Sequence, residues 1–457
     1  MADRVTDPAL EALGYKPQFR RVLSRGDLVL YGLVILTPTA AYPVFGIVQQ
    51  VSHGHAALSY LVALVAMLFT ASSYGKMAGA FPAAGSTYTY AQRSLSEHIG
   101  FLAGWSMILD YVLIPLLSVV YISLTAARLL PLVPYFVWAA VFSIGITLVN
   151  VRGIRVTALV SKALLYIMAT STVLFVFLAA RSVLLGQGAK ALVQPRAVFD
   201  PQQFSLPGLM LGAGIATLSY IGFDAVSTLA EDTRNPKRDI PFAMLVVCIL
   251  QAVFCFLTVY LAAIAWPAGR PFQDVETAIL DVSQYVGGTF LFGFITFVLL
   301  VAGLASSLTA QAGASRLLFG MGRDGVLPQS VFGYIDPKHA TPTRSIYLMG
   351  FIAFAGSLLS GFQLIVELLN FGAFVGFILV NLSVIRHYFF RLRRRRGMDF
   401  LTNLVFPMLG ALVCTYVWVS LSHNAKLVGF AWLGVGVVYL AVLTGGFKRS
   451  PVSLQIE

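Results

Sequence analysis

The chain has 457 residues, of which 58% are hydrophobic and only 11% are charged, and its mean hydropathy is +0.83. Soluble domains carry about 25% charged residues, so this composition excludes a soluble globular protein and indicates a multi-pass membrane protein. The formal net charge of +12 would suit a nucleic-acid ligand. However, the basic residues lie between apolar segments, where they set membrane topology, and we expect no nucleic-acid partner and only the lipid bilayer around the chain.

About twelve apolar segments are long enough to cross a bilayer, at roughly 17–25 residues each. They lie near residues 26–50, 57–80, 99–127, 133–150, 156–180, 206–230, 241–264, 289–320, 345–361, 363–385, 400–421 and 427–447. We predict an all-α membrane protein with a polar cytoplasmic segment over residues 1–25 and no cleavable signal peptide. A transporter core would follow over residues 26–390, and residues 391–457 would add a basic loop and two C-terminal helices.

The distribution of basic residues predicts the orientation of the chain. If the N-terminus is inside, most of the 31 Lys and Arg residues fall on the inner side, including the run from Arg391 to Arg396. The outer side then holds only Arg128, Arg181, Lys190, Arg196, Arg270 and Lys426. Because positive charge is retained on the cytoplasmic side, we expect both termini in the cytoplasm and the chain in a bacterial inner membrane.

The sequence offers little support for redox, metal or catalytic chemistry. Cys248, Cys255 and Cys414 all lie within predicted spans, so we expect neither a structural disulfide nor a disulfide-linked partner subunit. The histidines lack metal-ligand spacing, and His53 and His55, in a short outer loop, are expected to be solvated. HExxH, GxSxG and phosphate-loop motifs are absent from the sequence. We therefore expect no enzyme activity, no metal and no cofactor.

Two predicted spans are interrupted near their centres. The first contains Thr37-Pro-Thr-Ala-Ala-Tyr-Pro43, in which each proline removes a backbone donor. The sixth contains Ser219-Tyr-Ile-Gly-Phe-Asp224, and a charge at the bilayer midplane costs about 2.5–3.5 kcal/mol even on the lenient insertion scale. Broken helices at that depth must be packed in protein or line a cavity. Because corresponding breaks in two halves are typical of inverted-repeat carriers, we predict repeats over residues 26–187 and 206–390, with a cation site at the breaks.

Four motifs in order identify a family resemblance. They are Phe81-Pro-Ala-Ala-Gly-Ser-Thr-Tyr-Thr-Tyr90, Gly100-Phe-Leu-Ala-Gly-Trp105, Tyr220-Ile-Gly-Phe-Asp224 with Glu231-Asp-Thr-Arg-Asn-Pro-Lys-Arg-Asp-Ile-Pro241, and Ala314-Ser-Arg-Leu-Leu-Phe-Gly-Met-Gly-Arg-Asp-Gly-Val-Leu-Pro328. Over roughly residues 25–390 the chain resembles permeases of the amino acid–polyamine–organocation (APC) superfamily. The resemblance implies a LeuT-type fold, with a five-plus-five inverted repeat, discontinuous helices 1 and 6, and two further helices.

Within that superfamily, three stretches look most like bacterial putrescine importers: Phe45-Gly-Ile-Val48, Tyr74-Gly-Lys76 with the following Ala83-to-Gln92 segment, and Leu109-Asp-Tyr111. Many amino acid permeases have a Glu where Lys76 stands and a glycine-rich turn where this chain has Thr37-Pro38-Thr39. That turn presents backbone N–H groups to the substrate carboxylate, whereas proline supplies none. The departure favours a substrate without a carboxylate, such as a di- or polyamine.

The resemblance assigns Asp224 as the acid that follows the unwound part of span six, and we predict that it binds an ammonium group. Asp110 is the second candidate, although it also suits a packing role, as does Glu367 near the outer side. Aromatic rings would complete an amine site through cation–π contacts. The remaining predicted substrate-binding residues are Thr37, Thr39, Tyr42, Tyr111, Ser219, Tyr220, Gly222 and Phe223.

Energy coupling and gating are assigned only through the same resemblance. Asp224 or Asp110 would carry a proton, whereas Ser306 and Ser307 fall where sodium-coupled relatives place hydroxyl ligands. Small hydroxyls also pack membrane helices, so H⁺ is favoured over Na⁺ as the coupling ion. Glu231, Asp232 and Arg234 would form an inner gate, or else a solvated loop with helix caps.

These observations predict a secondary active transporter that imports a cationic amine, putrescine or a related polyamine, by symport and alternating access. One alternative is a permease of the same fold for cationic or neutral amino acids. Another, from a different class, is a membrane-bound sensor that binds an amine without transporting it.

Overall fold

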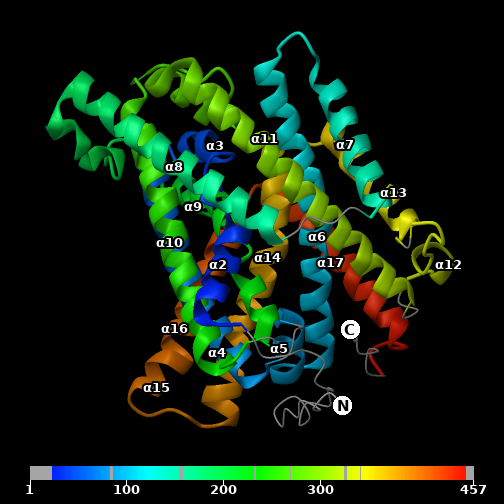
Figure 1. Ribbon diagram of the computed structural model, residues 1–457. Helices are drawn as coiled ribbons and strands as arrows, with labels where there is room; N and C mark the ends of the chain where they lie inside the picture. The colour runs from blue at the N-terminus through cyan, green and yellow to red at the C-terminus, as the bar shows by residue number, and fades with distance from the viewer. Residues whose placement is uncertain are drawn as a thin grey trace.

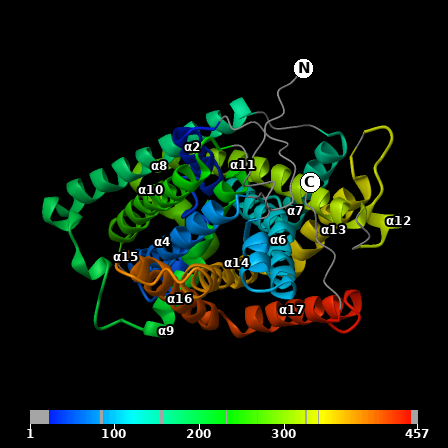
Figure 2. The same ribbon diagram turned by 90° about the horizontal axis from the view of Figure 1, so that it is seen from below.

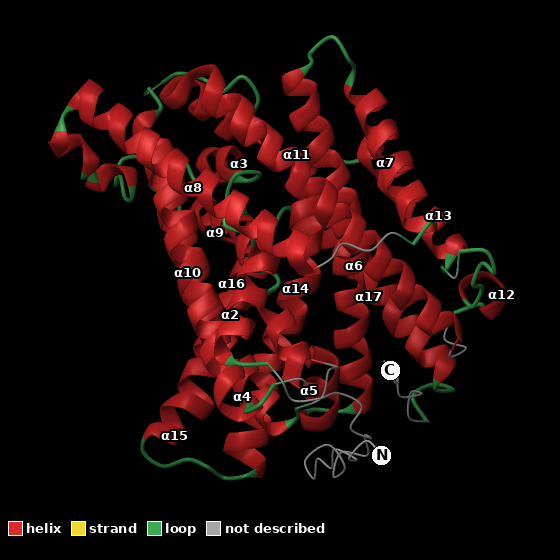
Figure 3. Cartoon of the chain, viewed as in Figure 1, coloured by secondary structure: helices red, strands yellow, loops and turns green. Residues whose placement is uncertain are grey.

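The computed structural model describes residues 23–82, 86–153, 158–230, 233–267, 269–323, 327–339 and 341–448. Within these ranges the secondary structure is helical, apart from one isolated bridge between Leu23 and Thr233. The described chain is a bundle of helices joined by short connections (Figure 1 and Figure 3). The prediction of an all-α protein is therefore confirmed.

Nine helical segments in the described ranges are long and apolar enough to cross a membrane. They are Ala56–Ala80, Glu97–Leu129, Ala163–Gln187, Leu206–Ser227, Pro236–Ala265, Val275–Ser315, Phe362–Arg391, Met398–Ser420 and His423–Leu443. Two more helices, Tyr135–Val151 and Thr343–Leu359, are apolar but shorter. Since about 20 apolar residues span the hydrocarbon core, the chain is a multi-pass membrane protein.

The helices follow the predicted segments closely. The longer α-helices are α2 (Arg25–Leu36), α4 (Ala56–Ala80), α6 (Glu97–Leu129), α7 (Tyr135–Val151), α8 (Ala158–Gln187), α9 (Leu206–Ala216), α10 (Pro236–Ala265), α11 (Ala278–Arg323), α13 (Thr343–Leu359), α14 (Phe362–Val384), α16 (Phe406–Ser420) and α17 (His423–Leu443). The shorter ones are α3 (Phe45–Val51), α5 (Ser86–Ser94), α12 (Gln329–Phe332) and α15 (Met398–Phe400). The 3₁₀ turns are η1 (Ala189–Leu192), η2 (Pro195–Ala197), η3 (Thr217–Tyr220), η4 (Phe223–Ala230) and η5 (Val275–Thr277), and the π-helical turns are η6 (Ile385–Arg391) and η7 (Leu401–Val405).

Helix α11 begins earlier than the predicted span at 289–320. It starts at Ala278 and contains non-helical backbone angles at Gly288 (φ 62°, ψ −162°). Glycine adopts a positive φ without the steric penalty of a side chain. The hydropathy pattern therefore locates the main part of the helix, which follows this kink, and misses the shorter helical segment ahead of it.

A reciprocal tryptophan pair docks the last helix, α17, onto α6. Trp105 donates its indole N–H to the carbonyl of Trp432 at 3.0 Å, and Trp432 donates to the carbonyl of Trp105 at 3.1 Å. The two rings stack with centroids 4.8 Å apart. A Cβ on Gly436 would lie 2.4 Å from the Trp105 ring, so this contact requires a glycine.

In Figure 2, α16 and α17 lie along one edge of the molecule and α8 lies along the opposite edge.

The prediction that His55 is solvated is wrong, because its side chain is only 1% exposed. Its Nδ1 lies 2.8 Å from the carbonyl oxygen of Ser52, and its Nε2 accepts the backbone N–H of Asp200 at 3.0 Å. Phe199 and Phe204 pack against the ring. The segment that precedes α9 therefore folds back over this histidine, a long-range contact that the local sequence does not reveal.

Glu367 anchors the turn between α16 and α17. Its side chain is 1% exposed, and its two carboxylate oxygens accept the Gln363 side-chain amide at 2.9 Å and the backbone N–H of Ser422 at 2.7 Å. Ser422 in turn caps α17 by accepting the N–H of Ala425. Both carboxylate oxygens are thus bonded within the protein, and this geometry matches the packing role rather than a ligand role.

Glu367→Gln is expected to lower the free energy of unfolding by about 1–3 kcal/mol, because it weakens a charged hydrogen bond to a buried N–H group. Thermal unfolding of the purified protein would measure the change. Gln363→Ala is the matched control and should have a smaller effect, since it leaves the Ser422 contact intact. A Glu367→Gln variant with unchanged unfolding but lost transport would instead make this acid functional.

Candidate functional site

The first predicted break lies between α2 and α3. Helix α2 begins with a capping box, in which Ser24 and Asp27 exchange hydrogen bonds, and it ends at Leu36. Thr37 then takes a positive φ of 56°, and α3 starts only at Phe45. The two prolines of this segment cannot donate to a helical ladder. The break therefore occurs where the sequence predicts it.

The break leaves backbone carbonyl groups without helical partners, and side chains from two neighbouring helices donate hydrogen bonds to them. Gln251 of α10 donates its amide to the carbonyl oxygens of Thr37 at 2.9 Å and Leu36 at 3.4 Å. Thr172 of α8 donates its hydroxyl to the carbonyl of Pro38 at 3.3 Å. Buried carbonyl groups need such donors, so α8 and α10 hold the broken helix in place.

The second break lies between α9 and η4. Helix α9 passes through the 3₁₀ turn η3 to an extended Ile221, after which Gly222 has a φ of +113°. A Cβ on Gly222 would lie 2.5 Å from the Cγ2 atom of Ile35 in α2. Both the backbone angle and this close approach require a glycine. The two breaks are therefore packed directly against each other.

Gly222→Ala is expected to destabilise the protein by about 1–3 kcal/mol through backbone strain and to reduce transport, because the new methyl group collides with α2. Unfolding midpoints and uptake rates would measure both effects. Gly145→Ala is the control, since a Cβ at that helical glycine meets nothing within 4 Å. Wild-type uptake and stability in Gly222→Ala would contradict the structural requirement for glycine.

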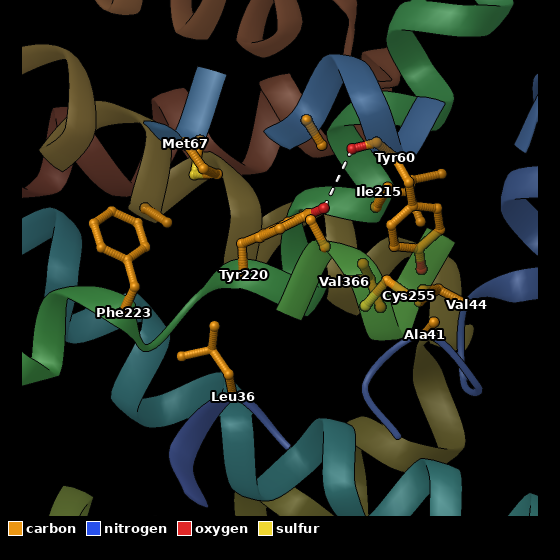
Figure 4. Close-up of a cluster of buried hydrophobic side chains, with 14 of the residues drawn as sticks. Leu36, Ala41, Val44, Tyr60, Met67, Ile215, Tyr220, Phe223, Cys255 and Val366 are labelled. Carbon is orange, nitrogen blue, oxygen red and sulfur yellow. Dashed lines mark hydrogen bonds between the residues drawn. The ribbon is translucent and has the colours of Figure 1, made fainter. Parts of the chain in front are cut away.

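Hydrogen bonds also join the two breaks through α4. Ser219 donates its hydroxyl to the carbonyl of Ala40 at 3.1 Å and lies 3.2 Å from the hydroxyl of Tyr60. Tyr220 donates to the carbonyl of Tyr60 at 3.2 Å, the contact drawn as a dashed line in Figure 4. Leu36 and Tyr220, one from each broken helix, both belong to the buried apolar cluster drawn in that figure. The predicted residues Ser219 and Tyr220 therefore bond within the protein.

Asp224 follows the second break and is half-buried. Its Oδ1 accepts the backbone N–H of Gly222 at 3.2 Å, and its carbonyl accepts the hydroxyl of Ser227 at 2.6 Å. Across the described residues, no cationic side chain forms an ion pair with this carboxylate. The carboxylate therefore has backbone contacts but no charged partner in the described part of the chain.

Asp110 of α6 is the second acid at this level and is only 4% exposed. Neither of its carboxylate oxygens has a hydrogen-bond partner in the described part of the chain. It lies against α14, where a Cβ on Gly372 would be 3.0 Å from its Oδ1, and Asp224 follows Phe223, which packs on Phe377 of the same helix. Burying an unpaired carboxylate is costly, so this pair of acids favours either bound protons or a bound cation.

The aromatic neighbours differ in part from those predicted. Phe223 packs at 5.5 Å from the ring of Tyr74 and 5.4 Å from Phe377, and the hydroxyl of Tyr74 lies 2.6 Å from that of Thr87. Tyr111 follows Asp110 in α6, but it is 46% exposed. Tyr42 instead packs against α8, with its hydroxyl 3.5 Å from that of Thr172. The structure thus places Phe223 next to Asp224 and packs Tyr74 against it; the sequence placed Tyr74 in a motif but did not predict it at the site.

The predicted coupling and substrate residues do not all gather at the acids. Ser306 and Ser307 of α11 bond to α6, through the hydroxyl of Ser118 and the carbonyl of Pro115, each at 3.5 Å. Thr39 is buried within the first break at 4% exposure.

At the opposite end of α2, the backbone N–H of Arg234 bonds to the carbonyl of Leu23 at 3.1 Å. Arg25 forms an ion pair with Asp239 at 2.5 Å and lies over the ring of Phe242, so α2 is tied to α10 there. The predicted gate residues Glu231 and Asp232 lie outside the described residues. The Arg25 contact was not predicted, because nothing in either local sequence identifies its partner.

Comparisons with known proteins agree with this architecture. A family model for amino acid permeases matches residues 44–439. The low-affinity putrescine importer PlaP of Escherichia coli (strain K12) is 34% identical over 95% of this chain and 96% of its own length. Two Bacillus subtilis (strain 168) proteins, the branched-chain amino acid permease BcaP and a methylthioribose transporter, are each 27% identical over 94% of this chain and 94% of their own lengths. With its apolar helices and two broken segments, this chain belongs to the amino acid permease family.

Proposed function

We propose that this protein is a secondary active transporter that imports a cationic amine, putrescine or a related polyamine, across the bacterial inner membrane. One observation carries the substrate class. Two neighbouring acids at membrane depth, Asp224 and Asp110, have no cationic partner among the described residues. A dication supplies two ammonium groups, one for each acid. The relationship to PlaP supports the same substrate class.

Each site residue has a distinct role in this proposal. Asp224 binds the first ammonium group and Asp110 the second, and their positions on η4 and α6 set the preferred substrate length. Phe223, Tyr74 and Tyr111 would supply aromatic rings for the amine, and such rings add about 0.5–2 kcal/mol per cation–π contact. Thr37, Thr39, Tyr42, Ser219, Tyr220 and Gly222 shape the two breaks against which the substrate binds.

The proposed architecture has twelve spans and a LeuT-type repeat of residues 26–187 and 206–390, with both termini in the cytoplasm. Its support is the pair of breaks, since corresponding interruptions in two halves mark carriers of this design. Alternating access would move α2 and η4 against the scaffold. The contact between Arg25 and Asp239 would open when the site faces inward, together with the segment that contains Glu231, Asp232 and Arg234.

Proton coupling is favoured over sodium coupling. Carriers of this design coordinate sodium with unwound backbone carbonyls, but here the Thr37 and Pro38 carbonyls already accept hydrogen bonds from Gln251 and Thr172. Either acid can instead carry a proton. A dication that enters a negative-inside cell also gains about 4.6 kcal/mol per 100 mV, so the membrane potential itself favours uptake.

Replacement of external sodium by choline is therefore expected to change the uptake rate by less than about twofold, because the Thr37 and Pro38 carbonyls already accept hydrogen bonds from the protein. Initial rates in proteoliposomes at constant potential and pH would measure it. A tenfold loss of the uptake rate without sodium would contradict proton coupling. It would support the alternative that Ser306 and Ser307 bind a sodium ion.

An amino acid permease of the same fold remains the second candidate, favoured by the kinship with BcaP. Pro38 and Pro43 argue against it, because they remove N–H groups that would bind a substrate carboxylate. The deciding experiment is uptake of labelled putrescine into proteoliposomes under a negative-inside potential, with competing diamines, leucine and arginine. Competition only by diamines would establish the amine carrier. Transport of leucine or arginine without putrescine would establish the amino acid permease, and binding without uptake would indicate a sensor.

A further inference from the structure

The segment between α14 and α16 carries more positive charge than the described residues neutralise. Six arginines occur at positions 386, 391, 393, 394, 395 and 396, and Lys76 of α4 packs beside them. Asp399 is the only acid in residues 386–405. No ion pair within the described ranges involves any of these basic side chains. We name residues 386–403 the basic hairpin.

The Lys76 side chain of α4 reaches the basic hairpin, where its hydrogen-bond acceptors are uncharged oxygen atoms. Its ammonium donates to the carbonyl oxygen of Thr402 at 2.8 Å and to the side-chain oxygen of Asn403 at 2.6 Å. The Asn403 amide then donates to the carbonyl of Arg394 at 3.1 Å. These bonds hold a half-buried ammonium in a fixed position without a carboxylate at ion-pair distance in the described chain.

Two cations share one aromatic ring at this point. The ring centroid of Tyr388 lies 5.7 Å from the Lys76 ammonium and 5.9 Å from the Arg394 guanidinium. The Asp399 carboxylate attracts the Lys76 ammonium more strongly than the Arg394 guanidinium repels it. Asp399 can balance only one of these charges. Six arginines and Lys76 against this single acid leave the basic hairpin with a large net positive charge, which attracts anions.

Arg395 follows Arg394 in the basic hairpin and packs on a second aromatic ring. Its guanidinium lies 4.8 Å from the Phe389 ring centroid, and its Nε donates to the carbonyl of Phe389 at 2.9 Å. Exposed apolar side chains flank these charges; Leu392 is 47% exposed and Met398 is 69% exposed. Apolar groups of this kind insert between acyl chains at a membrane surface. A soluble anion would gain nothing from contact with these apolar side chains.

We propose that Lys76, Tyr388, Arg394 and Arg395 form a binding site for the headgroup phosphate of an anionic phospholipid. The phosphate oxygens accept hydrogen bonds from the ammonium and the guanidinium groups, which bind phosphate strongly. The acyl chains cover the apolar side chains of the basic hairpin. The site is distinct from the acid pair at the helix breaks and does not depend on the proposed transport function.

The test uses the purified full-length protein with equal amounts of phosphatidylglycerol and phosphatidylcholine, and counts the bound lipids by native mass spectrometry. The parent protein is expected to retain phosphatidylglycerol preferentially. At about 1 kcal/mol per basic group near the surface, or roughly fivefold in affinity, Lys76→Gln should lower that preference about fivefold. Lys76→Glu should lower it about 20-fold, since it supplies Arg394 with an internal carboxylate.

The control is the double variant Arg152→Gln/Lys338→Gln, which removes two exposed basic side chains elsewhere and should leave lipid preference unchanged. Each variant is compared only as monodisperse folded protein. Equal phosphatidylglycerol retention by the parent and both Lys76 variants would overturn the proposal. So would an equal loss in the control, which would indicate general surface charge, or displacement of the lipid by inorganic phosphate, which would indicate a soluble anion site.

Discussion

Asp224→Asn is expected to reduce putrescine uptake into proteoliposomes by about 10- to 100-fold while the protein stays folded. The asparagine oxygen can still accept the N–H of Gly222, so the local backbone contact is kept and only the negative charge is lost. Hydrogen bonds to charged groups contribute about 1.5–3 kcal/mol, and each 1.4 kcal/mol is a factor of ten. Initial rates over a range of putrescine concentrations, at a fixed negative-inside potential, would measure the loss.

Asp200→Asn is the matched control, because it removes a carboxylate from the outer segment rather than from the helix break. Its uptake should equal that of the parent. Thermal unfolding of both variants would separate a lost ligand contact from a lost fold. Uptake by Asp224→Asn within twofold of the parent would show that this residue is not the ammonium partner and would remove the main support for an amine carrier.

The positions of the two helix breaks were predictable because local covalent chemistry determines them. Pro38 and Pro43 lack backbone donors, and Gly222 tolerates a positive φ. These constraints act within a few residues, so the sequence reveals them directly. The apolar lengths of the helices were predictable for a similar reason, since the bilayer thickness sets them.

The partners of the broken helices were not predictable in the same way. Gln251 and Thr172 lie far from Thr37 in sequence, and a polar residue inside an apolar span gives no indication of which helix it faces. Lipid-facing and protein-facing surfaces of a membrane helix are both apolar, so hydrophobic periodicity does not identify the packed face. Gln251, a polar residue within the predicted apolar span 241–264, was the one available signal in the sequence. It indicated a buried position but did not identify the residues that Gln251 contacts.

The aromatic residues show the same limit. The chain contains 19 tyrosines, so the presence of a tyrosine near a motif carries little information about its contacts. Tyr220 and Tyr42 were predicted to surround the substrate, yet both hydroxyls approach groups within the protein. Tyr74 lies beside Phe223 because α4 packs against the second break, a tertiary relationship that no local pattern encodes.

Asp110→Asn is expected to raise the KM for putrescine about tenfold, since the second ammonium group loses a charged acceptor. A four-carbon monoamine such as butylamine needs only one acid, so its inhibition constant should change little. Measuring both in the same proteoliposomes distinguishes a second ligand from a general defect. The double variant Asp110→Asn/Asp224→Asn should lose the preference for the dication over butylamine altogether.

The same Asp110→Asn substitution should stabilise the protein even as it impairs transport. Both oxygens of Asp110 lack partners in the described structure, and a buried carboxylate without partners destabilises the folded state. An amide of equal size removes the potential charge, so the thermal unfolding midpoint should rise in the absence of substrate. A lower midpoint with unchanged putrescine KM would contradict this role and make Asp110 a packing residue. An unchanged KM with a flattened pH profile of uptake would instead make Asp110 the proton carrier, with Asp224 alone binding the amine.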